Sequence, residues 1–134
     1  MTRFAIFLFV FVGSSCAPAY RICMDSQKPM RVGELFFGRD IPGRQPLSVE
    51  EWTEFTNSVV AKEFPGGFTV MDGEGQWRDP ATKVVINEPT KILVVALPPS
   101  SDLASRISRI RDAYRRLYRQ ISVGVLTYDA CGEF

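Results

Sequence analysis

Hydrophobic residues recur along this chain with two different periods, and the period changes in a fixed order. Segments rich in β-branched and aromatic residues predict strands; they lie at residues 30–38 (MRVGELFFG), 68–71, 83–87, 91–97 (KILVVAL) and 122–128 (SVGVLTY). Pro89 and Thr90 are expected to interrupt the strand that returns toward KILVVAL. Between the strands, apolar residues spaced three or four positions apart predict two helices.

The first helix is expected to start after Ser48, because Glu51 stands three residues further on, which is the spacing of a capping box. It should end at Pro65-Gly66-Gly67, and its apolar face is Trp52, Phe55, Val59 and Phe64. Ser101 or Asp102 caps the second helix. Its apolar stripe is Leu103, Ile107, Ile110, Tyr114, Leu117 and Ile121.

The order strand, helix, hairpin, helix, strand predicts an α+β fold of the ferredoxin-like βαββαβ type. Both helices should cover one face of an antiparallel sheet, and the hairpin between the second and third strands should be extended. With 134 residues in all, the chain divides into an N-terminal segment, a leader at 20–29 and one domain at 30–134.

Residues 1–19 resemble a signal peptide. Arg3 precedes a nine-residue apolar run, residues 4–12, which is too short to span a bilayer as a helix. Ala17-Pro18-Ala19 offers small residues for cleavage before Tyr20. The alternative is a lipobox at residues 13–16, which would leave Cys16 lipidated and the protein associated with the outer membrane or cell surface. Both alternatives predict export, to the periplasm or beyond.

Export to an oxidising compartment would allow the two remaining cysteines to form a disulfide. If the first and last strands pair side by side, Cys23 and Cys131 come to the same end of the sheet, within reach of a disulfide. Two free thiols remain the alternative.

The composition excludes several kinds of chemistry. The chain has no histidine, which removes Ser-His and Cys-His nucleophiles and histidine-based zinc sites. Its net charge of +1 shows no overall attraction to nucleic acid. We therefore expect no metal, no cofactor and no nucleic-acid partner.

Residues 64–77 (FPGGFTVMDGEGQW) contain four glycines but do not fit a phosphate-binding loop, since the run does not open a helix. Gly66-Gly67 fits a helix C-cap, and Gly73 and Gly75 fit a bulge that bends a long strand. Trp77 is expected to be an aromatic residue packed on its strand rather than a surface for a ligand.

Several short motifs, in order, resemble the bacterial domain-of-unknown-function family numbered 3574. They are residues 34–38 (ELFFG), 51–52 (EW), 64–70 (FPGGFTV), 75–78 (GQWR) and 88–91 (EPTK), and the resemblance covers about residues 30 to 128. It implies a small exported protein, often a lipoprotein, and it implies no activity.

The sheet face away from the helices is the first place to look for function. In KILVVAL both alternating sets are apolar: Leu93, Val95 and Leu97 on one side, Ile92, Val94 and Ala96 on the other. A second apolar face needs a cover, which could be another copy of the chain, a ligand, or loops of the same chain.

Polar residues near this face form the candidate ligand site. They are Glu34, Arg39, Gln76, Trp77, Arg78, Glu88 and Lys91. A carboxylate beside an arginine or lysine could bind a polar ligand, or it could be a structural ion pair. An enzyme would need Glu34 or Glu88 as acid or base, with Arg39 or Lys91 orienting an anion.

The two helices differ in charge. The second carries Arg106, Arg109, Arg111, Arg115, Arg116 and Arg119 against Asp112, whereas the first is mainly acidic. This pattern fits pairing between the helices, or association with an anionic surface. The sequence thus supports three functions: a binding or structural module that dimerises through its open face, a small cofactor-free enzyme, or a surface-associated protein.

Overall fold

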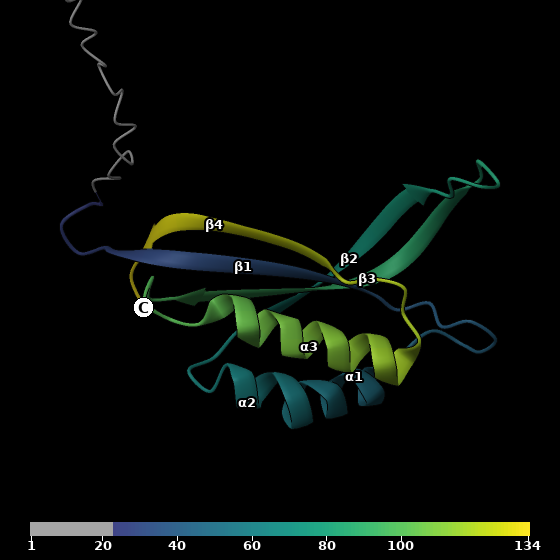
Figure 1. Ribbon diagram of the computed structural model, residues 1–134, viewed down its shortest axis with the longest axis horizontal. Coiled ribbons are helices and arrows are strands. Elements are labelled where there is room, and N and C mark those ends of the chain that lie inside the picture. Colours follow the sequence, from purple (N-terminus) through teal and green to yellow (C-terminus); the bar gives the residue numbers. More distant parts are fainter. Residues whose placement is uncertain (1–22) are drawn as a thin grey trace, which may run out of the picture.

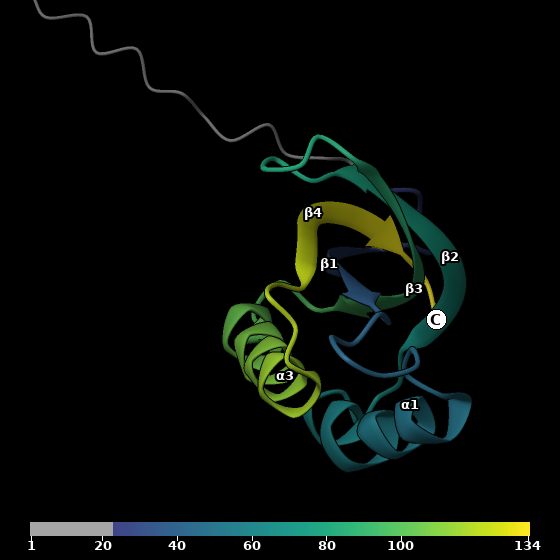
Figure 2. The same cartoon turned by 90° about the vertical axis from the view of Figure 1, so that its right-hand side faces the viewer.

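The computed structural model describes residues 23–134 as one antiparallel sheet covered on one side by helices (Figures 1 and 2). The elements are β1 (Lys28–Gly38), α1 (Val49–Phe55), a π-helical turn (Thr56–Val60), α2 (Ala61–Glu63), β2 (Thr69–Arg78), β3 (Val85–Leu97), α3 (Leu103–Tyr118) and β4 (Gly124–Gly132). Their order is the predicted one. The predicted signal peptide and Cys16 lie outside the described residues.

The sheet has the strand order β2-β3-β1-β4, and all three neighbouring pairs are antiparallel. The first and last strands are therefore neighbours, as the sequence predicted. β1 pairs with β3 only as far as Gly38 opposite Thr90. The outer half of the β2–β3 hairpin consequently pairs only with itself and extends past the rest of the sheet (Figure 1).

The core lies between the sheet and the helices. Leu35 and Phe37 from β1 and Leu93 and Val95 from β3 face the helices and are buried. Aromatic rings from three elements meet there, and the Phe37 ring lies 4.8 Å from that of Tyr114 in an edge-on contact.

Three details of the helices differ from the prediction. Val60 takes the core position predicted for Val59, because the π-helical turn widens the spacing to five residues after Phe55. In α3, Tyr118 packs on Tyr114 with rings 4.8 Å apart, and Leu117 is exposed. The helix ends at Tyr118, so Ile121 lies beyond it and is 90% exposed.

β3 runs without a break through Pro89, contrary to the prediction. The Arg39 amide donates to the Pro89 carbonyl, so this carbonyl points toward the end of β1. The carbonyl and the nitrogen of a strand residue point to the same side, so the Pro89 nitrogen also points away from β2. The missing N–H of proline therefore costs no hydrogen bond with β2.

The predicted bulge at Gly73 and Gly75 was wrong, because the β2–β3 register is continuous. The glycines relieve crowding instead. A Cβ at Gly73 would lie 3.0 Å from Ile92 Cδ1, and one at Gly75 would lie 2.9 Å from Thr90 Oγ1. Gly67 adopts φ +112°, as expected for the glycine that ends a helix.

The structure contains the predicted disulfide between Cys23 and Cys131, with 5.5 Å between the Cα atoms. β4 is two residues later at its start than predicted and continues to Gly132, so Cys131 lies within the strand, opposite Pro29. β1 likewise starts at Lys28, inside the predicted leader. Within residues 23–134 no helix is both long and apolar enough to cross a membrane.

Candidate functional site

A cavity of about 800 Å³ lies where the hairpin extends past the end of β1. It is lined from four parts of the chain: Phe36 and Gly38 of β1; Asp40, Ile41 and Pro42 of the following loop; Trp77, Asp79, Pro80, Ala81, Ile86, Glu88 and Thr90 of the hairpin; and Arg119, Gln120, Ile121, Ser122 and Gly124 between α3 and β4. We call it the hairpin cavity. Its volume is within the range of small-molecule sites.

Glu88 is the half-buried carboxylate of the hairpin cavity. It lies over Gly38, where a Cβ would come within 2.2 Å of Glu88 Oε1. The backbone N–H of Asp40 donates to the same oxygen at 3.1 Å. The side chain is thereby held at the junction of β1, the loop and the hairpin.

Burial raises the pKa of the Glu88 carboxyl above its ordinary value of 4.5, and the charge of Asp40 raises it further. The Asp40 N–H and the Trp77 side chain partly oppose this rise. The increase reflects the cost of holding a carboxylate away from water.

The remaining wall residues combine apolar surface with charge. Trp77 is 44% exposed and Ile121 projects almost fully into solvent, so apolar groups border the opening. Asp79 accepts hydrogen bonds from the backbone of Ala81 and Thr82, both at 2.8 Å, which lowers its pKa and keeps it ionised.

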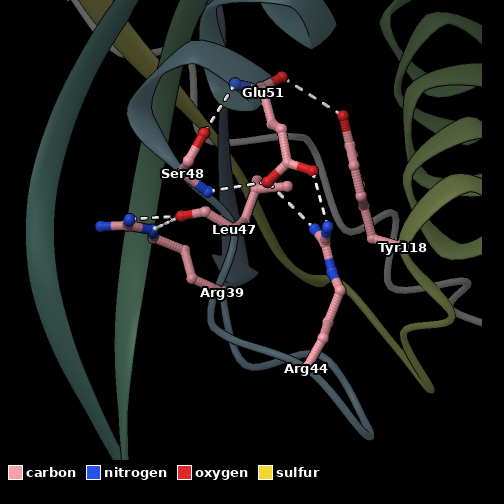
Figure 3. Close-up of polar contacts among 6 residues, drawn as sticks. All are labelled: Arg39, Arg44, Leu47, Ser48, Glu51 and Tyr118. Atoms are coloured by element: carbon pink, nitrogen blue, oxygen red, sulfur yellow. Dashed lines mark hydrogen bonds and ion pairs between the residues drawn. The ribbon is translucent and has the colours of Figure 1, made fainter.

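A polar cluster clamps the loop that supplies one wall (Figure 3). Arg39 donates through its side chain to the Leu47 carbonyl, and the Leu47 amide donates to the Arg39 carbonyl at 2.8 Å. Arg44 forms a two-pronged ion pair with Glu51, at 2.8 and 3.0 Å. The two ends of the loop are thus bonded to each other, and its middle is fixed to the first turn of α1.

Two contacts from the α3 region fix the cavity from other sides. The buried Tyr114 hydroxyl donates to the Gly38 carbonyl at 2.8 Å. Its pKa is raised, mainly by burial and in part by the charges of Tyr118 and Glu88. The side chain of Gln120 donates to the Asp40 carbonyl, which joins two walls of the cavity.

Of the seven residues predicted for the site, the structure brings only Trp77 and Glu88 together in the cavity. Glu34 is on the open face further along β1, where it accepts a hydrogen bond from Tyr128 at 2.6 Å. This bond raises the pKa of Tyr128. Arg39 holds the loop, as described above.

The other three have local partners. Gln76 donates to the Asn87 side chain and Arg78 to the Lys83 carbonyl, each at 2.8 Å. Lys91 is on the helix side of the sheet and forms an ion pair with Asp72, opposite it on β2. Neither Arg39 nor Lys91, the two alternatives predicted to orient an anion, therefore lines the cavity beside Glu88.

Sequence reasoning missed Asp40, Asp79, Arg119 and Ile121, which come from loops. In the sequence, Asp79-Pro80 indicates only a turn. The spacing of Leu117 and Ile121 predicts that the second helix continues to residue 121, and no periodicity shows that the residues after α3 face the hairpin. Within residues 23–134 no group of three acidic or cysteine side chains is arranged to hold a metal ion.

Two arginines of α3 bind Glu63 at the end of α2. Arg109 forms an ion pair with Glu63, with two contacts of 2.8 Å, and Arg106 donates to the Glu63 backbone carbonyl. This pairing lowers the Glu63 pKa. Arg115 bonds the Ile121 carbonyl at 3.1 Å and so helps to place the cavity rim.

The model of a family of proteins of unknown function, DUF3574, matches residues 33–134. The chain belongs to this family. The family match confirms the resemblance seen in the sequence motifs, and it brings no activity with it. No curated protein matches the chain in sequence.

Solved structures show a similar fold. A phage SAM lyase in complex with S-methyl-5'-thioadenosine aligns with a TM-score of 0.57 and 9% identity, covering 85% of this chain and 95% of the lyase chain. A phage SAM lyase in the apo state aligns with a TM-score of 0.49 and 11% identity, over 87% of this chain and 98% of the other. At such identities the first likeness concerns the fold alone.

Proposed function

We propose that this DUF3574 protein binds a small organic molecule in the hairpin cavity. The observation that carries the proposal is the half-buried carboxyl group of Glu88, whose pKa is raised in a cavity of about 800 Å³. Proteins rarely hold a carboxyl group in such a place unless it serves packing or a ligand. Here the Asp40 amide donates a hydrogen bond to the carboxyl group, and the cavity lies open beside it.

An enzymatic version of the proposal would use Glu88 as the acid or base, because burial raises its pKa and general acids and bases work best when their pKa lies close to the working pH. A lyase of similar fold has been solved in complex with S-methyl-5'-thioadenosine, which makes this compound a reasonable first probe. The likeness is one of fold, so nucleosides and aromatic amines belong in the same panel.

Tryptophan fluorescence tests the binding. The chain has two tryptophans, and Trp52 is buried in the core whereas Trp77 lines the cavity. A ligand in the cavity should change the Trp77 emission in a saturable way, and Trp77→Phe should abolish the change while Trp52 still reports an intact fold. A signal that persists in Trp77→Phe, or a panel without any saturable binding, would contradict the proposal.

A second candidate function is self-association through the open sheet face. Met71, Leu126 and Tyr128 lie on this face and are each about half exposed, beside half-buried Val94 and Ile92. Light scattering under non-reducing conditions should show a dimer that Leu126→Glu converts to monomer. Leu117→Glu is the matched control, because Leu117 is equally exposed on α3. A monomeric wild-type protein would exclude this candidate.

We also propose that the chain is exported and that its fold is of the ferredoxin-like type. The disulfide supports an oxidising compartment, and the strand order β2-β3-β1-β4 supports the fold type. Mass spectrometry of the purified protein should find Tyr20 as the first residue, or a lipid on Cys16. An intact Met1 would contradict export by either route.

A further inference from the structure

We infer that the ligand of the hairpin cavity is an organic cation: an amine, quaternary ammonium or sulfonium group attached to a flat apolar body. This inference rests on the proposed function and adds the chemical class of the ligand. It follows from the charges and the aromatic surface that the cavity presents together.

The charged side chains of the cavity are mostly acidic. Among the described residues that line it, Asp40, Asp79 and Glu88 are acidic and Arg119 alone is basic. Asp79 stays ionised because backbone amides hold its carboxylate. Arg119 follows the end of α3 in a left-handed conformation with φ 52°, and its side chain is exposed. Water therefore screens the charge of Arg119 more strongly than that of half-buried Glu88.

Two of these acidic residues, Asp40 and Glu88, are direct neighbours in the cavity wall. The Asp40 amide contacts Glu88 directly, and the Asp40 charge disfavours ionisation of Glu88. A positive ligand group placed beside Glu88 would relieve both the repulsion and the burial cost. An anion there would add to both.

Aromatic and aliphatic side chains complete the site. Trp77 and Phe36 offer ring surface, and Ile86 and Ile121 add aliphatic surface on the hairpin and at the rim. Tryptophan is the ring that attracts cations best, and a flat apolar body gains from the same surfaces. Carboxylate and indole side by side therefore favour a cation over a neutral molecule of equal shape.

Three probes of nearly equal shape separate charge from shape: 2-phenylethylamine, 2-phenylethanol and phenylacetate. The experiment uses the purified protein with the N-terminus that the cell leaves on it, and follows Trp77 emission at pH 7. The amine should bind at least about tenfold tighter than the alcohol, and phenylacetate most weakly.

Glu88→Gln keeps the shape of the side chain and removes its charge. This variant should bring the affinity for the amine to within about twofold of that for the alcohol, and leave the alcohol unchanged. Glu34→Gln is the matched control, since Glu34 lies on the same sheet face outside the cavity and its loss changes the net charge equally. It should leave the preference for the amine intact.

The outcomes distinguish the two proposals. If the alcohol binds as tightly as the amine, if phenylacetate binds best, or if Glu88→Gln keeps the preference, the cation inference is wrong and small-molecule binding stands. If no probe here and none of the wider panel binds, both proposals fail. Tight binding of phenylacetate would assign the decisive charge to Arg119.

Discussion

Glu88 and Gly38 form a matched pair across two strands. The carboxyl group of Glu88 occupies the space that any side chain at position 38 would fill. The absence of a Cβ on Gly38 therefore decides that a carboxylate can lie at the floor of the hairpin cavity.

Gly38→Ala should displace the Glu88 carboxyl group into water. Since the clash falls on the end of a flexible side chain, the protein should fold with little loss of stability, whereas the Glu88 pKa should return toward its ordinary value. An NMR titration of the Glu88 side-chain carboxyl carbon measures this. Gly66→Ala is the control, because no atom lies within 4 Å of the added methyl group. An unchanged Glu88 pKa in Gly38→Ala would contradict the proposed geometry.

The pH dependence of stability should carry the signature of Glu88. The pKa of Glu88 is higher in the folded state than its ordinary value of 4.5. In the pH window between the ordinary pKa and the folded-state pKa, Glu88 is therefore mostly protonated in the folded protein and mostly ionised in the unfolded chain. The contribution of Glu88 to the free energy of unfolding is thus most favourable below this window and is lost as pH rises through it.

Urea titrations of wild type and Glu88→Gln at pH 4 and pH 7 test this sign. The variant should gain stability relative to wild type on going to pH 7, because glutamine has no charge to bury. Asp40, Asp79, Tyr114 and Arg119 are the other titratable groups around this site, and they are present in both proteins. A difference that does not change with pH would show that Glu88 titrates as in water.

Among the elements, the start of α1 anchors the loop that supplies one wall of the cavity. The Ser48 hydroxyl accepts from the Glu51 amide at 3.2 Å, and the Glu51 carboxylate accepts from the Ser48 amide at 2.9 Å (Figure 3). The same carboxylate binds Arg44, and together these bonds lower the Glu51 pKa. One glutamate thus both caps the helix and anchors the cavity loop.

Ser48→Ala should lower the free energy of unfolding by about 1 kcal/mol, the usual cost of losing an N-cap side chain. Urea unfolding followed by circular dichroism measures it. Ser108→Ala, at an exposed position inside α3, should change stability by only a few tenths of that amount. Equal effects of the two substitutions would show that the cap contributes nothing.

At the scale of the whole molecule, the disulfide joins the two ends of the described chain. It closes a loop of sequence separation 108, for which the chain-entropy relation gives about 5 kcal/mol, whereas measured disulfide contributions are typically about 2–4 kcal/mol. The double variant Cys23→Ser/Cys131→Ser should therefore unfold at clearly lower urea concentration than wild type. Reducing the wild type should give the same midpoint as the double variant, and reductant should leave the variant itself unchanged. A double variant as stable as the oxidised wild type would contradict this role.

Local patterns predicted the helices and strands well. They failed where a neighbouring segment determines whether a residue is buried or exposed. The capping box, the helix face around Trp52 and the alternation in KILVVAL depend on residues close in sequence, and all are present. Ile121 was assigned to a helix stripe by its spacing alone. Its exposure depends on where α3 ends, which the left-handed conformation of Arg119 sets.

The candidate site was predicted less well for the same reason. Trp77 and Glu88 stood out as polar and aromatic residues on a hairpin, but the partners that give them a chemical environment come from loops distant in sequence. Lys91 and Gln76 were grouped with them by proximity in the chain, although strand alternation turns both to the opposite face.

By itself the sequence determined the α+β class, the order of the elements and the family, and it placed Cys23 and Cys131 within reach of each other while leaving two free thiols as the alternative. These follow from periodicity, motif order and the neighbouring positions of the first and last strands, all of which are carried by local residues and topology. The sequence also predicted an extended hairpin, but only the tertiary structure decided where β1 stops beside it, that a clamped loop and the chain after α3 close a cavity beneath it, and that Glu88 lies inside. A cavity is a property of surfaces that different segments leave unfilled, and the spacing of residues along one segment does not contain it.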